Sequence, residues 1–142
     1  MSCSVDDTTE HTLQRAMIAG DNFKKWNIAR EIPANDNVDC RPEAAHIADN
    51  AWIFYRNGDF KFDSGESNGN VICADFIDFT GSWYITEGKN LKIVASKATY
   101  EAEIIFNDEI ILFGTIDDLT EDRIELSRNG HTVIFHPSTA GL

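Results

Sequence analysis

Basic residues and long apolar runs are both scarce in this sequence of 142 residues. Twelve Lys and Arg stand against 24 Asp and Glu, which gives a formal net charge of −12. Such a charge repels phosphate backbones, so we expect no nucleic-acid partner. No apolar run approaches the roughly 20 residues of a membrane-spanning helix, and only three prolines interrupt the chain.

Motifs for catalysis and metal binding are also missing. The sequence has no Gly-x-Ser-x-Gly elbow, no phosphate-binding glycine loop and no paired-cysteine metal motif. His131 and His136 flank one expected strand at opposite parity, so we interpret them as surface or barrel-rim residues and not as metal ligands. Asn35, Asn37 and Asp39 have the spacing that opens a calcium loop, but the central glycine and later glutamate of such a loop are missing. We therefore predict a non-enzymatic protein with no metal and no cofactor.

Aromatic residues, in contrast, are abundant, and the clearest group surrounds an Asn-Gly turn. The run from Trp52 to Phe62 is typical of a β-hairpin about Asn57-Gly58. A three-residue loop with a G1 bulge pairs Phe54 with Phe60 and Trp52 with Phe62, whereas a two-residue turn shifts the register by one. We favour the bulged loop because it gathers four aromatic side chains on one face, and burial of each is worth roughly 1.5–3 kcal/mol.

The same alternation of apolar and polar residues recurs along the chain. We expect Trp26 and Ile28 to point inward from the first strand, and a two-residue type I′ turn at Asn129-Gly130. The segments that we expect to be strands, besides the aromatic hairpin, are 24–32, 71–79, 81–86, 90–94, 100–106, 109–115 and the hairpin 123–135. Among these, 100–106 and 109–115 are expected to pair about Asn107-Asp108.

Eight or nine short antiparallel strands, joined to their neighbours by tight turns, predict an all-β, up-and-down antiparallel β-barrel. A helix precedes the strands, with Asp7 and Glu10 at capping-box spacing and Gly20 at its end. Its apolar face is expected to contain Leu13, Ala16 and Met17, and we interpret the helix as a plug over one end of the barrel. We predict one domain over 8–142 after a flexible tail, 1–7.

Several motifs together resemble the bacterial lipocalin-like domains, calycin-type barrels that exported lipoproteins often carry. The resemblance covers residues 22 to 136 and depends on the order and spacing of the motifs more than on any one of them. The motifs are Lys25-Trp26, Cys40, Phe54-x-x-Asn57-Gly58-x-Phe60, Cys73, Gly81-Ser82-Trp83 with Leu91 and Ile93, and Ile116-x-x-Leu119-x-x-Asp122-x-Ile124-x-Leu126.

The three cysteines suggest a pair with one left over. A bridge between Cys40 and Cys73 would close a loop of about 34 residues and stabilise the fold by on the order of 4 kcal/mol; two unrelated buried thiols are the alternative. The family resemblance implies the Cys40–Cys73 disulfide, because the matching cysteines commonly bridge. The tail 2–7 resembles a lipoprotein cleavage site with Cys3 as the lipidated residue, although no apolar leader precedes it. We hypothesise that Met1 replaces a removed leader, which implies a protein of the cell envelope that contacts a membrane only through this anchor.

Two functional hypotheses follow. The first is a carrier that holds a small hydrophobic ligand in the barrel. Its candidate lumen residues are Trp26, Trp52, Phe54, Phe60, Phe62, Trp83, Ile85, Tyr100 and Phe113. These side chains could equally fill a narrow barrel completely. The second hypothesis is therefore a surface module that contacts a protein or glycan through loops 35–39, 64–70 and 117–122. The sequence does not indicate an oligomeric state.

Overall fold

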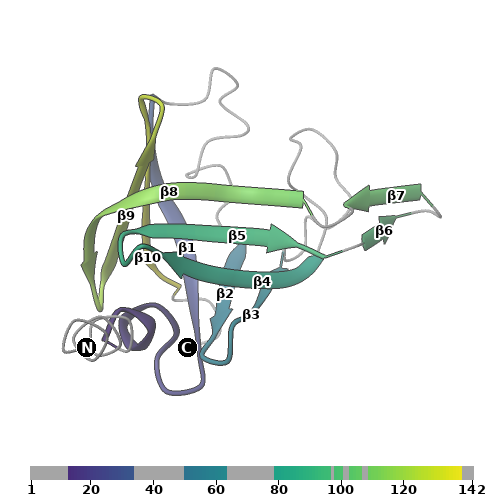
Figure 1. Cartoon of the computed structure of the whole chain (residues 1–142), viewed down its shortest axis with the longest axis horizontal. Helices are drawn as coiled ribbons and strands as arrows, with labels where there is room; N and C mark the ends of the chain where they lie inside the picture. The colour runs from purple at the N-terminus through teal and green to yellow at the C-terminus, as the bar shows by residue number, and fades with distance from the viewer. Residues whose placement is uncertain are drawn as a thin grey trace.

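A computed structural model of the chain describes residues 13–33, 50–63, 79–96, 98–100, 103–106 and 109–138 (Figure 1). After a helical segment, 13–19, ten strands follow within this described part. They are β1 (Phe23–Ile32), β2 (Ala51–Tyr55), β3 (Asp59–Asp63), β4 (Phe79–Thr86), β5 (Asn90–Ala95), β6 (Ala98–Tyr100), β7 (Glu103–Phe106), β8 (Glu109–Thr120), β9 (Arg123–Arg128) and β10 (His131–Pro137). Of the expected strand 71–79, residues 71–78 lie outside the described residues, and Phe79 begins β4.

Eight of the strands close into an antiparallel barrel in the order β1-β10-β9-β8-β5-β4-β3-β2. The first and last strands of the barrel pair with each other, with Trp26 opposite Pro137 and Ile28 opposite Phe135. Pairing of β1 with β10 means that neither of these two strands presents a free sheet edge along its paired residues. The predicted all-β, up-and-down barrel is confirmed.

The β2–β3 hairpin has the bulged register that the aromatic pattern predicts. Trp52 lies opposite Phe62 and Phe54 lies opposite Phe60. Gly58 closes the three-residue loop with a φ of 103°, and its backbone N–H donates to the Tyr55 carbonyl at 3.0 Å. A positive φ is accessible to glycine at little steric cost, so Gly58 permits the register that places all four aromatic side chains inside the barrel.

The β9–β10 turn also follows the prediction. Asn129 and Gly130 have φ values of 52° and 82°, as a type I′ turn requires. The turn places Leu126 opposite Val133 and Ile124 opposite Phe135.

The pairing of β8 differs from the prediction. β7 pairs with β6 in a separate two-stranded sheet, while β8 pairs with β5 and β9 in the barrel. The expected hairpin about Asn107-Asp108 is therefore wrong. β8 pairs with β5 because Leu91 and Ile93 give β5 a fully buried inner face. The long β8 extends this apolar face around the barrel. Tyr100 lies in β6, and its side chain is outside the described part, so its assignment to the barrel lumen stays a prediction.

An aromatic cluster fills the barrel interior where β2, β3 and β4 meet. The rings of Phe54 and Phe60 lie 5.1 Å apart, and those of Phe54 and Trp83 lie 5.5 Å apart, both edge to face. Trp52 contacts Phe62 at 5.3 Å and reaches across the barrel to Phe135 at 5.4 Å. Edge-to-face pairs at these separations add roughly 0.5–1.5 kcal/mol each beyond area burial.

The helical segment covers one end of the barrel, as predicted, but with a different face (Figure 1). Ile18 and Ala19 are fully buried, and the Trp26 indole Nε1 donates to the Ile18 carbonyl at 2.7 Å. Leu13 is 57% exposed, so the predicted inward face of Leu13, Ala16 and Met17 is wrong. The Trp26 indole and the barrel end determine which face is buried, and these tertiary contacts are not visible in the local sequence pattern. The predicted end at Gly20 is confirmed by its φ of 64° and its N–H bond to the Ala16 carbonyl.

Polar contacts hold the helical segment against the strand turns. The Gln14 Nε2 donates to the Gly88 carbonyl of the β4–β5 turn at 2.7 Å, and the Arg15 guanidinium donates to the Arg56 carbonyl of the β2–β3 turn at 2.6 Å. The Arg15 guanidinium also lies over the Trp83 ring, 4.4 Å from the ring centre. Burial lowers the pKa of Arg15, and the nearby positive charge of Arg56 lowers it further. Within the described residues, no helix combines the length and apolar character that a membrane crossing requires.

The two faces of the helical segment predict different mutational costs. Ile18→Ala removes a fully buried side chain and should lower the free energy of unfolding by about 2–5 kcal/mol. Leu13→Ala, the matched control on the exposed face, should change it by less than about 0.5 kcal/mol. Urea unfolding measures both values. Equal losses in the two variants would contradict the assignment of the buried face.

Gly81 predicts a second structural test, because β4 and β5 approach each other closely there. A Cβ at this position would lie 1.9 Å from the Val94 carbonyl oxygen. Gly81→Ala should therefore force the strands apart and destabilise the protein by about 1–3 kcal/mol. Ser82→Ala, one residue further along the strand, should change stability by less than about 0.5 kcal/mol in the same thermal or urea measurement. A neutral Gly81→Ala variant would show that the two strands are spaced differently.

Candidate ligand-binding site at the barrel mouth

The two ends of the barrel are built differently. The helical segment and the β2–β3 and β4–β5 turns meet at one end, as described above. At the other end lie the β9–β10 turn and the beginning of β8. β8 and β9 separate toward this end, since Thr115 and Ser127 are their last paired residues. In the described part of the chain, residues 109–114 then pair with β5 alone.

A pocket of about 250 Å³ occupies the place where β8 and β9 separate. Its inner wall contains Leu112, Gly114, Leu126 and Val133. Leu126 is buried, while Leu112 and Val133 are partly buried and pack against the core. Register explains their direction, because Leu112 lies opposite the buried Ile93 and Val133 lies opposite Leu126. The volume falls just below the usual 300–1,000 Å³ of small-molecule sites, so the pocket suits a small ligand or one part of a larger ligand.

Two nitrogen-bearing side chains stand at the rim of this pocket. Arg128 and His131 lie opposite each other across the β9–β10 turn, and both are exposed. The Arg128 guanidinium lies over the Phe113 ring, 4.9 Å from its centre, and so spans the gap between β9 and β8. Among the described residues that line the pocket, none is acidic. The rim can therefore accept a carboxylate or another hydrogen-bond acceptor, while the wall accepts apolar groups.

Most of the predicted lumen residues lie elsewhere, in the packed core. Six of them are buried, and the seventh, Ile85, is partly buried against the same cluster. The six are Trp26, Trp52, Phe54, Phe60, Phe62 and Trp83. They point inward as predicted, but none of them lines the pocket at the mouth. This part of the barrel is occupied by its own side chains.

Among the predicted lumen residues whose side chains the structure describes, only Phe113 borders the pocket, although its expected direction is wrong. It lies opposite Lys92, whose neighbours Leu91 and Ile93 point inward, so Phe113 belongs to the outer face. The prediction took the direction of Phe113 from the hairpin expected about Asn107-Asp108, whereas β8 pairs with β5 and has a bulge opposite Ile93 and Val94. The alternation of Leu112, Gly114 and Ile116 was the signal for the true inner face.

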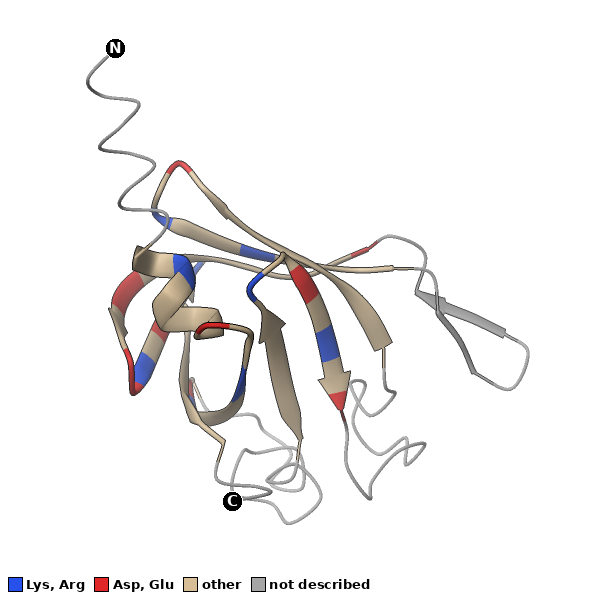
Figure 2. Cartoon of the chain, turned by 90° about the horizontal axis from the view of Figure 1, so that it is seen from below, with Lys and Arg blue, Asp and Glu red and all other residues tan. Residues whose placement is uncertain are grey.

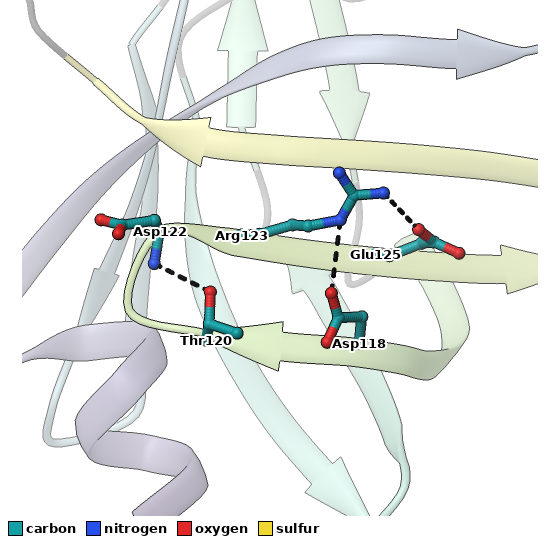
Figure 3. Close-up of polar contacts among 5 residues, drawn as sticks. All are labelled: Asp118, Thr120, Asp122, Arg123 and Glu125. Carbon is teal, nitrogen blue, oxygen red and sulfur yellow. Dashed lines mark hydrogen bonds and ion pairs between the residues drawn. The ribbon is translucent and has the colours of Figure 1, made fainter.

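The acidic segment 117–122, expected to be a loop, is mostly strand. β8 continues to Thr120, and only Glu121 and Asp122 form the turn. Arg123 bonds two carboxylates on the outer face, Asp118 at 3.4 Å and Glu125 at 2.6 Å (Figure 3). The Arg123 and Asp118 side chains are 39% and 50% exposed, so this pair contributes at most about 1 kcal/mol.

The other candidate binding segments, 35–39 and 64–70, lie outside the described residues, as do Cys3, Cys40 and Cys73. Across the ranges that the structure describes, no three His, Cys, Asp or Glu side chains are grouped so that they could hold a metal. The residues described above make the site at the barrel mouth an apolar pocket with a polar rim.

Comparisons with known proteins give one structural similarity. No family model and no curated protein matches the chain. The crystal structure of a lipocalin-like protein from Bacteroides uniformis is similar at a TM-score of 0.48 and 14% sequence identity, over 84% of this chain and 97% of that one. At this level the similarity bears on neither ligand nor site, and the architecture described here depends on the strand pairing alone.

Proposed function

We propose that the protein is a non-enzymatic, lipocalin-like binding protein that takes a small hydrophobic ligand at the mouth of its barrel. The observation that carries this proposal is the pocket where β8 leaves β9, with Leu112 and Val133 above the buried Leu126. Partly exposed apolar side chains facing one cavity lose contact with water when a ligand enters, and each Å² of such burial is worth about 25 cal/mol.

The packed aromatic cluster limits where the ligand lies. The Phe60 ring lies 6.0 Å from the Trp52 ring and 5.1 Å from the Phe54 ring, which are ordinary packing distances. Insertion of a ligand among them would require the core to open, which is costly in a close-packed interior. The ligand therefore occupies the mouth and leaves the centre of the barrel unchanged.

A surface module that contacts protein or glycan is the competing function, and the same packed core favours it. Of its three candidate segments, 117–122 is largely held in β8, and Arg123 bonds Asp118 on its outer face. A ligand titration separates the two functions, because a surface module has no use for the mouth pocket.

The test is a titration of the full chain with octanoate, decanoate and the corresponding alcohols, in which binding is monitored by backbone amide NMR shifts. We expect saturable shifts in residues 111–114 and 126–133. Val133→Phe fills the pocket and should weaken binding at least about tenfold, a loss of about 1.4 kcal/mol. Val94→Phe on the outer face of β5 is the matched control and should bind like the original chain.

Two results would contradict the carrier. One is the absence of saturable shifts with every probe. The other is equal affinity in the Val133→Phe and Val94→Phe variants while both remain folded by circular dichroism.

The proposal extends to the location of the protein. We propose that it is exported and held at the cell envelope by a lipid on Cys3, with Cys40 and Cys73 joined in a disulfide. The support is the sequence resemblance to lipocalin-like domains of exported lipoproteins, and an oxidising compartment is where such a bridge persists.

Alkylation under denaturing conditions without reductant tests the disulfide. A chain with a free Cys3 and a Cys40–Cys73 bridge takes up one alkyl group by mass, and after reduction it takes up three. Cys40→Ser should free Cys73 and raise the unreduced count to two. Three groups on the unreduced original chain would rule the bridge out.

A further inference from the structure

A second groove, of about 580 Å³, lies at the end of the barrel that the helical segment covers. One wall is the helix face that contains Leu13, Ala16 and Met17. This face is left over because the helical segment uses Ile18 and Ala19 to contact the barrel. The groove therefore has an apolar wall that the fold leaves partly open, with Leu13 more than half exposed and Ala16 and Met17 partly buried.

The opposite side of the groove is acidic. Asp21, two residues before β1, and Glu121-Asp122 of the β8–β9 turn line it, and all three are exposed. In Figure 2 the acidic β8–β9 turn lies beside the helical segment. Three carboxylates thus stand next to an apolar helix face.

Lys24, the one basic residue among the described groove residues, is already engaged. Its Nζ donates to the Met17 carbonyl at 3.3 Å and to the Glu121 carbonyl. The ammonium also lies over the Trp26 ring, 4.4 Å from its centre. Burial lowers the pKa of Lys24, and the nearby Glu121 and Asp122 act in the opposite direction. Because this single cation faces three carboxylates, the groove keeps a net negative charge.

The negative charge of the groove indicates which kind of segment could bind there. Residues 1–12 of the chain contain Asp6, Asp7 and Glu10 but no Lys or Arg, so like charge disfavours this segment at the acidic rim. A second copy of a chain with a net charge of −12 meets the same repulsion. A segment with apolar side chains for the helix face and cationic side chains for Asp21, Glu121 and Asp122 satisfies both walls.

We propose that this groove is a docking site for a cationic amphipathic segment of a partner protein. Leucine-like side chains of the partner segment contact Leu13 and Met17, and Lys or Arg side chains of the same segment lie at the acidic rim. This is the helix-and-groove mode of peptide recognition, in which apolar anchors supply affinity and charges supply orientation. The site is independent of the mouth pocket, which lies at the other end of the barrel.

The experiment uses the full chain and a fluorescent peptide of about 14 leucines and lysines in an amphipathic helical pattern. Anisotropy should show saturable binding that weakens as salt is raised. An otherwise identical peptide with Glu in place of Lys should not bind. Amide NMR shifts should concentrate in residues 13–24 and 121–122.

Variants separate the groove from a general attraction between opposite charges. Leu13→Ser with Met17→Ser should weaken binding at least tenfold, whereas Tyr84→Ser, which removes an apolar side chain that is 49% exposed on β4, should leave it within twofold. Glu121→Gln with Asp122→Asn should weaken binding severalfold, whereas Glu109→Gln on β8 should not. Unchanged affinity in the Leu13/Met17 variant, binding of the Glu peptide, or shifts centred on another face would each overturn the proposal.

Discussion

Contact between the two arms of the β2–β3 hairpin is the interaction on which the rest of the structure depends. The hairpin places Trp52 and Phe54 opposite Phe62 and Phe60, and all four rings point to the inside of one sheet. So large an apolar face must be shielded from water. The sheet curls until β1 pairs with β10, which brings Phe135 into contact with Trp52 and buries the apolar face within the same chain. Barrel closure is thus the consequence of a register set by one bulged turn.

The filling of the barrel determines where binding can occur. The aromatic cluster fills the interior along β2, β3 and β4, and the helical segment covers the end where Trp26 bonds the Ile18 carbonyl. β8 and β9 separate at the other end, where the wall changes from aromatic rings to Leu112 and Val133. The two grooves of this protein therefore lie at opposite ends, and they differ in chemistry. The rim of the mouth carries Arg128, whereas the groove beside the helix carries carboxylates.

Local turn chemistry explains which parts of the fold could be predicted from the sequence. Asn57-Gly58 and Asn129-Gly130 define their hairpin registers within a few residues, and both registers are confirmed. The β5–β8 pairing is not local, because the β6–β7 hairpin stands between these strands in the chain. The direction predicted for Phe113 depended on the hairpin expected about Asn107-Asp108, and the actual partner β5 places Phe113 opposite Lys92 on the outer face. His131 is at the barrel rim as predicted. His131 and Leu112 line the same pocket because β8 separates from β9, and no sequence pattern indicates that separation.

Nuclear Overhauser contacts between the Trp52 and Phe135 rings test the closed, aromatic-filled barrel most directly. These residues lie on β2 and β10, and only closure through β1 brings them together, at 5.4 Å between ring centres. We predict strong contacts from the Trp52 ring to both Phe135 and Phe62. Contacts from Trp52 to Phe62 without any to Phe135 would show an open sheet. Contacts to neither ring would show that the hairpin register is wrong.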